Sequence, residues 1–320
     1  MADELTGLKV PGFTLPVPST VSPQAQAFLS AAAKRIAAGP PFGDQSEAAE
    51  RAMQFLRPKA AAFKGATETI DLGNGALLYR VVPESRSGRR AEVAYFDIHG
   101  GGFTAGGGEM CRVLAMLRAD DYGVEVWSVD YRLAPQHAYP AALDDCMVAW
   151  REVLKHRKPQ DIVAAGASAG GNLVAAMLLR AQDEGLPLPA ALLMLTPAVD
   201  MTGAGDTRIS NRFHDPNLYG GGGGGPDSYA GSADKNHPYL SPVHGSFSKA
   251  WPPTLLSSGT RDLLLSDTVR MHRALRKAGI RAELHVTEAG GHGGFMGTAP
   301  EDSDLMGECR RFCDEAWGIA

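Results

Sequence analysis

The sequence predicts an α/β protein built on a mostly parallel, doubly wound sheet. From about residue 66 onward, apolar runs typical of strands alternate with helical patterns, as in a series of βαβ units. Runs that are apolar on both faces, such as 191–195, suit parallel strands covered by helices on both sides. With 320 residues, of which 44 % are hydrophobic, the chain can form one such core with an appended lid.

The expected elements follow in chain order from these patterns. Residues 23–63 look helical, with a break near Gly39-Pro40-Pro41. Strands are expected at 92–98, 124–129, 161–165, 190–195, 254–257 and 282–286. Helices are expected at 141–155, 169–184, 267–278 and 301–317. The segment 197–251 is too long for an ordinary loop and contains six consecutive glycines, so we expect a mobile lid or partial disorder there.

Composition and charge exclude several classes of protein. The net charge is −5 and no basic stripe occurs, so we expect no nucleic-acid partner. No signal peptide is recognisable, and we expect a soluble, cytoplasmic protein with no membrane partner. The uncharged stretch 162–179 is long enough to suggest a membrane span, but glycines interrupt it. The four cysteines lack metal-ligand companions, so we expect reduced, largely buried thiols and no metal.

The strongest chemical signal is Gly166-Ala167-Ser168-Ala169-Gly170. It matches G-x-S-x-G, the nucleophile elbow of α/β-hydrolases, in which the serine lies at a sharp turn between a strand and a helix. Small neighbours are needed because backbones crowd that turn, and here a strand pattern precedes the serine and a helical pattern follows it. Ser168 is therefore the predicted nucleophile. The alternative is a helix start made of small residues.

A second glycine-rich segment, His99-Gly100-Gly101-Gly102, follows the strand expected at 92–98. Consecutive glycines can direct backbone N–H groups into a cavity, as an oxyanion hole requires. The alternatives are a flexible loop or a phosphate cradle. The expected donors are the N–H groups of Gly101, Gly102 and Ala169, supported by Gly100, Gly166 and Gly170. His99 precedes the nucleophile in the chain, so we expect an orienting or structural histidine there.

The fold orders its catalytic residues as serine, then acid, then histidine. Asp262 follows the strand expected at 254–257, at a strand end where α/β folds place functional residues. Asp267 competes with it, but Asp267 precedes a helix and is expected to cap its N-terminus. Asp262 is therefore the predicted acid.

The predicted base is His292, which lies in the glycine-rich loop Gly290–Gly294 between the last strand and the last helix. A histidine on a flexible glycine loop has no packing reason to be there. His285 lies within the expected strand and His272 within an expected helix, so we expect both to be packed or solvated.

Together these segments resemble the hormone-sensitive-lipase-like esterases, the bacterial family IV group. The matching segments are 99–103, 129–135 with 140–145, 166–172, 259–264, and His292 near Phe295. The resemblance implies an α/β-hydrolase core at 66–196 and 251–320, with a helical cap made of an N-terminal segment, 1–65, and an insertion, 197–250. It also implies short- to medium-chain carboxylic esters as substrates, and no cofactor.

The expected function is that of a serine esterase acting through an acyl-enzyme. A lactone hydrolase or an amidase with the same triad is the alternative among enzymes. A receptor-like, non-catalytic ligand-binding protein is the alternative of another class, although such relatives lack the catalytic histidine. The expected partner is a small-molecule ester, and a homodimer is left open. The candidates to line the substrate pocket, which have packing of the cap as their alternative role, are Phe13, Leu15, Phe28, Phe103, Phe213, Leu218 and Tyr219.

Overall fold

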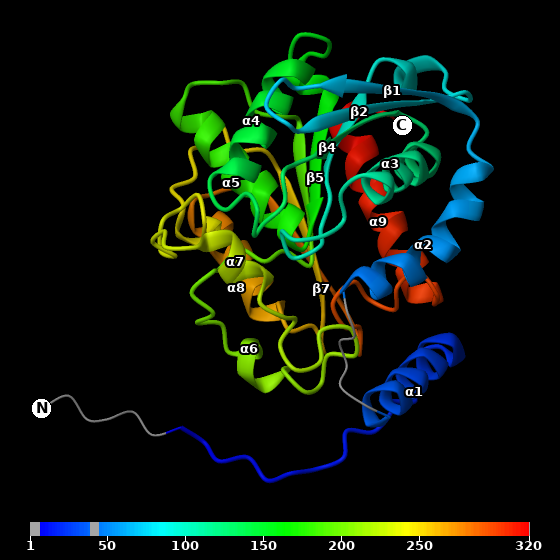
Figure 1. Cartoon of the computed structure of the whole chain (residues 1–320), viewed down its shortest axis with the longest axis vertical. Coiled ribbons are helices and arrows are strands. Elements are labelled where there is room, and N and C mark those ends of the chain that lie inside the picture. The colour runs from blue at the N-terminus through cyan, green and yellow to red at the C-terminus, as the bar shows by residue number, and fades with distance from the viewer. Residues whose placement is uncertain (1–6, 39–44, 320) are drawn as a thin grey trace, which may run out of the picture.

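The computed structural model describes residues 7–38 and 45–319, and within them the strands form one eight-stranded sheet in the order β1-β2-β4-β3-β5-β6-β7-β8 (Figure 1). The strands are β1 (Gly65–Asp71), β2 (Leu77–Pro83), β3 (Ala94–Ile98), β4 (Glu125–Asp130), β5 (Ile162–Ala167), β6 (Ala191–Leu195), β7 (Thr254–Gly259) and β8 (Ala282–Thr287). The helices are α1 (Pro23–Ala37), α2 (Gln45–Ala61), α3 (Glu109–Tyr122), α4 (Ala141–Val153), α5 (Ala169–Asp183), α6 (Thr207–Ser210), α7 (Gly225–Ala230), α8 (Leu265–Lys277) and α9 (Pro300–Trp317).

The predicted α/β fold is confirmed. Strands β3 to β8 are parallel to one another and correspond to the six expected strands, and α4, α5, α8 and α9 correspond to the four expected helices. The two helices α1 and α2 confirm the helical interpretation of residues 23–63. The break expected near Gly39 lies outside the described residues.

Two features were not expected from the sequence. Strands β1 and β2 form an antiparallel hairpin at one edge of the sheet, and β2 pairs antiparallel with β4. The outer strand β1 is exposed along nearly its whole length, so it lacks the apolar pattern that marks the inner strands. Helix α3 was missed because small residues, Cys111, Ala115 and Ala119, carry much of its buried face.

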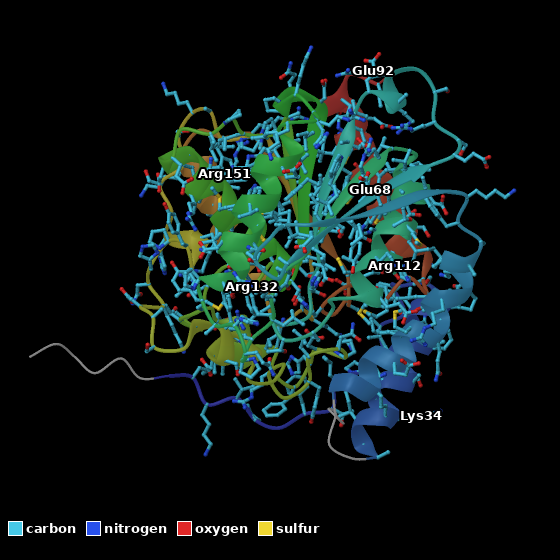
Figure 2. The ribbon with its side chains drawn as sticks, turned by 45° about the horizontal axis from the view of Figure 1, so that its top comes forward. Lys34, Glu68, Glu92, Arg112, Arg132 and Arg151 are labelled. Atoms are coloured by element: carbon cyan, nitrogen blue, oxygen red, sulfur yellow. The ribbon has the colours of Figure 1, made fainter. Side chains whose placement is uncertain are left out.

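The sheet is covered on both faces, as a parallel sheet requires. Strand β3 shows the alternation that produces the two cores: Phe96 packs edge-on against Trp150 of α4, and the neighbouring Tyr95 stacks on Tyr122 of α3. Helices α4, α5 and α8 share one core, and α3 and α9 share the other. Charged side chains such as Glu68, Glu92 and Arg151 remain on the outside (Figure 2).

Helix α1 packs on the segment between β8 and α9. Its apolar face, with Ala25 and Leu29, contacts Phe295, and the Ser22 hydroxyl donates a hydrogen bond of 2.8 Å to Glu301. Figure 1 shows α6 and α1 both at the lower end of the molecule, α6 toward the left and α1 toward the right. The N-terminal segment and the insertion between β6 and β7 also touch, because the Arg35 guanidinium donates to the carbonyl of Pro216.

The glycine run of the insertion has a defined path in the structure. Residues 220–223 all have positive φ, between 79° and 116°. Residues with a Cβ rarely adopt this backbone conformation, so the geometry of the chain requires glycine there. A run of glycines also favours mobility. The mobility of this segment stays a prediction.

The four cysteines are free and buried, as expected. In the part of the chain that the structure describes, no helix is both long enough and apolar enough to cross a bilayer.

Candidate active site

Three residues far apart in the chain meet at the carboxyl ends of the strands. His292 Nε2 lies 2.9 Å from Ser168 Oγ, and His292 Nδ1 lies 3.2 Å from Asp262 Oδ1. Ser168 follows β5, Asp262 follows β7 and His292 follows β8. These are the three residues that the sequence predicted, and their geometry is that of a serine nucleophile, a base and an orienting acid.

The serine lies in a strained turn. Ser168 has φ 56° and ψ −118°, and its backbone N–H donates to the carbonyl of Leu195 on β6. The glycines beside it are required by space, because a Cβ at Gly166 would lie 2.2 Å from the carbonyl oxygen of Gly170, and one at Gly170 would lie 1.9 Å from that of Ile98. The serine precedes α5, but its side chain makes no capping hydrogen bond, so a simple helix start does not describe it.

The loop 99–102 runs beside this turn. A Cβ at Gly100 would lie 2.8 Å from the carbonyl oxygen of Ala167 and 3.3 Å from Ser168 Cβ, so only glycine allows this approach. Gly101 and Gly102 have φ 117° and 59°. Ala169 is the first residue of α5, where a backbone N–H has no partner within the helix. These three N–H groups are the candidate oxyanion donors.

His99 lies behind this loop and does not join the triad. It is buried, its ring stacks on Tyr131 with 4.2 Å between centroids, and Nδ1 lies 2.7 Å from the carbonyl oxygen of Gly100. Burial lowers the pKa of His99, which favours a neutral ring. This placement fits an orienting or structural role. Its ring also lies near Cys111 and Asp130, the one group of potential metal ligands among the described residues.

The carboxylate of Asp262 is buried and held by hydrogen bonds. Ser258 Oγ donates to Oδ2 at 2.7 Å, and the backbone N–H of Leu264 donates to Oδ1 at 2.8 Å. Oδ1 also faces the imidazole of His292. These contacts fix the direction in which the carboxylate presents its charge to the ring.

The expectation that Asp267 caps a helix was wrong. Helix α8 begins at Leu265, so Asp267 lies within its first turn, fully buried. Its carboxylate forms an ion pair with Arg208 of α6, at 2.8 Å, and accepts a hydrogen bond from the backbone of Asp200. The chain reaches α8 by a turn at Asp262, and this turn starts the helix two residues earlier than expected. Asp267 therefore joins the insertion to the core.

The surroundings of His292 favour its protonated form. Burial lowers the pKa of His292, but the nearby carboxylate of Asp262, helped by that of Asp215, raises it by more. The pKa consequently lies above the ordinary histidine value, and the charged imidazolium that forms during proton transfer is stabilised.

Asp215 is a residue of the site that the sequence analysis missed. It is fully buried in the insertion, and its Oδ2 accepts a hydrogen bond of 2.8 Å from the backbone N–H of Leu263. Its Oδ1 accepts one of 3.2 Å from the backbone N–H of His292. A Cβ at Gly291 would lie 2.8 Å from the same oxygen, so glycine is needed there. One carboxylate therefore joins the insertion to the loops of both the acid and the base.

The predicted pocket residues are not gathered in one place. Three of them pack: Phe103 stacks on Tyr229, Phe28 lies edge-on to Phe295, and Leu218 packs with Leu263 and Leu264. The others lie further out, with Phe13 and Phe213 more than 60 % exposed, Leu15 38 % exposed, and Tyr219 edge-on to Phe213.

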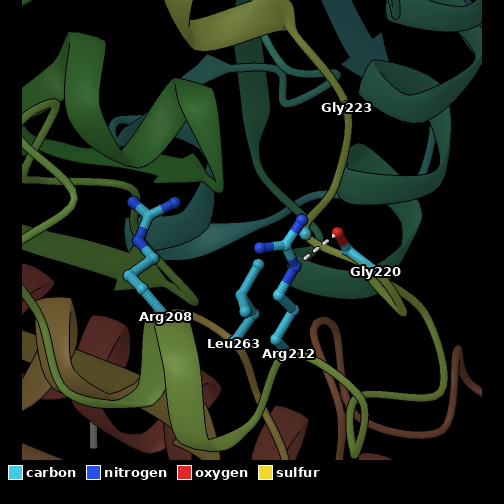
Figure 3. A pocket seen from close by; sticks show the side chains of 6 residues that line it. Arg208, Arg212, Gly220, Gly223 and Leu263 are labelled. Atoms are coloured by element: carbon cyan, nitrogen blue, oxygen red, sulfur yellow. Dashed lines mark hydrogen bonds between the residues drawn. The ribbon is translucent and has the colours of Figure 1, made fainter.

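A hollow borders Leu263, the residue after Asp262, and two arginines contribute to its lining. It has a volume of about 380 Å³ and is shown in Figure 3. Its lining consists of Arg208, Arg212, Gly220, Gly221, Gly223 and Leu263.

Comparison with known proteins agrees with this geometry. A family model described as the alpha/beta hydrolase fold matches residues 95–296. An acetyl-hydrolase of Streptomyces hygroscopicus is 31 % identical over 192 residues, which are 59 % of this chain and 62 % of that protein. An ethyl acetate hydrolase of Pseudomonas putida is 32 % identical over 71 % of this chain and 73 % of its own length. The chain thus spans less than two thirds of the first of these relatives.

Solved structures are similar over nearly the whole chain. A crystal structure of an esterase has a TM-score of 0.82 at 31 % identity, covering 96 % of this chain and 98 % of its own. A hormone-sensitive lipase from a metagenome library has a TM-score of 0.77 at 27 % identity, covering 91 % and 98 % of the two chains.

Proposed function

The chain belongs to the α/β-hydrolase-fold family, among its hormone-sensitive-lipase-like esterases, and from this premise we propose that it hydrolyses carboxylic esters with Ser168 as the nucleophile. The observation that carries the proposal is the continuous hydrogen-bonded series from Ser168 through His292 to Asp262. The presence of His292 within hydrogen-bonding distance of the serine argues against the non-catalytic, receptor-like alternative.

The reaction follows from the positions of these groups. As Ser168 Oγ attacks the ester carbonyl carbon, His292 Nε2 takes its proton, and Asp262 stabilises the resulting imidazolium. The N–H groups of Gly101, Gly102 and Ala169 stabilise the negative charge that develops on the carbonyl oxygen. His292 then protonates the leaving alcohol, and an acyl-enzyme remains. Water, deprotonated by the same histidine, releases the acid and restores the serine.

The two segments around the site complete the proposal. Residues 1–65 and 197–250 would form a cap over the triad, on a core made of 66–196 and 251–320. The contact of α1 with Phe295 and the hydrogen bonds of Asp215 with the triad loops support this division. Short- to medium-chain esters, a cytoplasmic location and a homodimer stay predictions.

The test is a rate profile over p-nitrophenyl esters of increasing acyl length, with Ser168→Ala as the matched control. We expect turnover that is highest for short to medium acyl chains and that falls by about 10⁴-fold or more in the variant. A γ-lactone and a butyramide, measured in parallel, address the two alternative substrates. Turnover of the amide or lactone well above that of every ester would contradict the proposal, as would near-normal ester turnover by a folded Ser168→Ala variant.

A further inference from the structure

The hollow in Figure 3 is lined by two arginines, three glycines and one leucine. The side chains of Arg208 and Arg212 border it, the backbone of the glycine run forms one wall, and Leu263 supplies an apolar floor. Its volume of about 380 Å³ is enough for a small organic group. Two guanidinium groups in so small a space favour a negatively charged occupant.

This hollow adjoins the catalytic groups. Leu263 directly follows the triad acid, and the charge of Arg208 is near enough to lower the pKa of His292. The glycine run continues to Gly225, where a Cβ would lie 2.2 Å from the carbonyl oxygen of Gly102 in the oxyanion loop. A ligand group in the hollow would therefore lie beside an ester bound at Ser168.

The two arginines differ in their counter-charges. Arg208 is already paired with the buried carboxylate of Asp267. Arg212 uses Nε to donate a hydrogen bond of 2.9 Å to the carbonyl of Gly220, as drawn in Figure 3. Among the residues that the structure describes, no carboxylate forms an ion pair with Arg212. The terminal nitrogens of Arg212 are thus charged donors at the hollow that no carboxylate of the described residues neutralises.

Hydrogen bonds hold the segment 207–212, which carries both arginines, against the loop after β7 that contains Asp262. Thr207 Oγ1, at the start of α6, donates to the carbonyl of Leu263 at 3.0 Å. Asn211 Nδ2, directly before Arg212, donates to the carbonyl of Asp262 at 2.9 Å and to that of Thr260 at 3.1 Å. Helix α6, which carries Arg208, and the turn after it, which carries Arg212, are therefore held against the loop that contains Asp262, as a binding site for a reacting molecule requires.

We propose that the substrates of this enzyme are esters that carry a carboxylate, and that Arg212 binds this carboxylate while the ester lies at Ser168. A guanidinium matches a carboxylate in shape and can bind it through two hydrogen bonds. Arg208, whose charge is balanced by Asp267, borders the opposite wall, and Leu263 contacts the methylene groups between carboxylate and ester. The proposal rests on the proposed ester hydrolysis and specifies its substrate class.

The test compares two esters of equal length. p-Nitrophenyl valerate and mono-p-nitrophenyl glutarate differ only in a terminal methyl against a carboxylate. We expect wild-type enzyme to prefer the glutarate, and Arg212→Gln to lower kcat/KM for the glutarate about tenfold or more, mainly through KM, with little change for the valerate. Arg212→Lys should retain part of the preference, and Lys249→Gln, an exposed cation of the same insertion, should retain all of it.

A second pair of esters locates the carboxylate. Phenyl valerate and 4-carboxyphenyl valerate differ by a carboxylate on the alcohol portion, whereas the first pair differs by a carboxylate on the acyl portion. If Arg212 governs the preference in only one pair, that pair shows which portion of the substrate carries the charge. Equal turnover of charged and neutral esters in both pairs, or a loss in Arg212→Gln that is the same for all four, would overturn the proposal and leave ester hydrolysis standing.

Binding without turnover separates the two proposals. Calorimetric titration with free glutarate, which has no ester bond, should show weak binding to wild-type enzyme. Arg212→Gln should lower this affinity about tenfold or more. If no ester is hydrolysed but glutarate binding depends on Arg212, the proposed function fails and the anion site stands. If glutarate binds both forms equally, the anion site fails.

Discussion

The carboxylate of Asp215 accepts a hydrogen bond from the backbone N–H of His292, with 3.2 Å between Oδ1 and the nitrogen. This contact links the insertion between β6 and β7 to the proposed catalytic base, and the second carboxylate oxygen makes the equivalent link to Leu263, beside the proposed acid. The position of the imidazole relative to Ser168 therefore depends on a residue outside the core. Two predictions concern this arrangement and its electrostatics.

Asp215→Asn should impair catalysis through the position of His292. The amide has one acceptor oxygen in place of two, so the N–H of either His292 or Leu263 loses its partner. We expect kcat to fall about tenfold, the cost of one such hydrogen bond. Since the negative charge of Asp215 also raises the pKa of His292, the acid limb of the pH–rate profile should move to lower pH. Asp206→Asn, an exposed acid of the same insertion, should change neither quantity. If the acid limb of the pH–rate profile does not move in Asp215→Asn, the role of Asp215 is structural only.

The pH dependence of kcat/KM should reflect the raised pKa of His292. The base acts in its neutral form, so activity is lost as the pH falls through this pKa. The pKa of an unperturbed histidine is about 6.5, and the carboxylates around His292 raise the pKa of this residue. The midpoint of the acid limb should accordingly lie above about 6.5 for a neutral ester such as p-nitrophenyl valerate. Full activity maintained to about pH 5 would contradict a histidine base.

Asp262→Asn and Asp267→Asn should separate catalysis from stability. The first should lower kcat by about 10⁴-fold, because the amide favours the wrong imidazole tautomer. The second leaves the partly buried guanidinium of Arg208 without its counter-charge, and we expect the free energy of unfolding to fall by roughly 1–3 kcal/mol. Urea unfolding and single-turnover kinetics on both variants check this ranking. The reverse ranking would transfer the catalytic role to Asp267.

Gly225→Ala should disturb the oxyanion loop. The new Cβ would lie 2.2 Å from the carbonyl oxygen of Gly102, so this backbone must shift, and we expect kcat to fall about tenfold or more. Gly224→Ala is a matched control, because Gly224 has negative φ and nothing lies within 4 Å of its Cβ position. Equal effects of the two substitutions on turnover would show that the contact with Gly102 has no catalytic consequence.

The segment 215–235 should move when ligands enter or leave. Hydrogen exchange in the free enzyme is expected to be faster there than in the core strands, and a covalently bound phosphonate ester should slow it. Protection equal to that of β5 and β7 in the free enzyme would rule out a mobile lid.

The sequence by itself determined the α/β fold and predicted the three residues that meet in the candidate triad. Inner strands such as β5 and β6 are apolar on both faces because helices cover both sides, and this pattern is local. Ser168 was predictable because the crowded turn between β5 and α5 admits only small residues, which leave a recognisable motif. Asp262 and His292 followed from the chain order that this fold imposes and from their places at strand ends.

Tertiary structure alone decided the features that depend on distant partners. Asp215 contacts Leu263 and His292, which are 48 and 77 residues away, so nothing beside it in the chain indicates its role. The burial of Asp267 depends on Arg208 of another helix, and the polar hollow depends on how the insertion folds onto the loop after β7. Local patterns record which side of an element is buried, whereas the partner that a buried polar group meets is set by packing between elements.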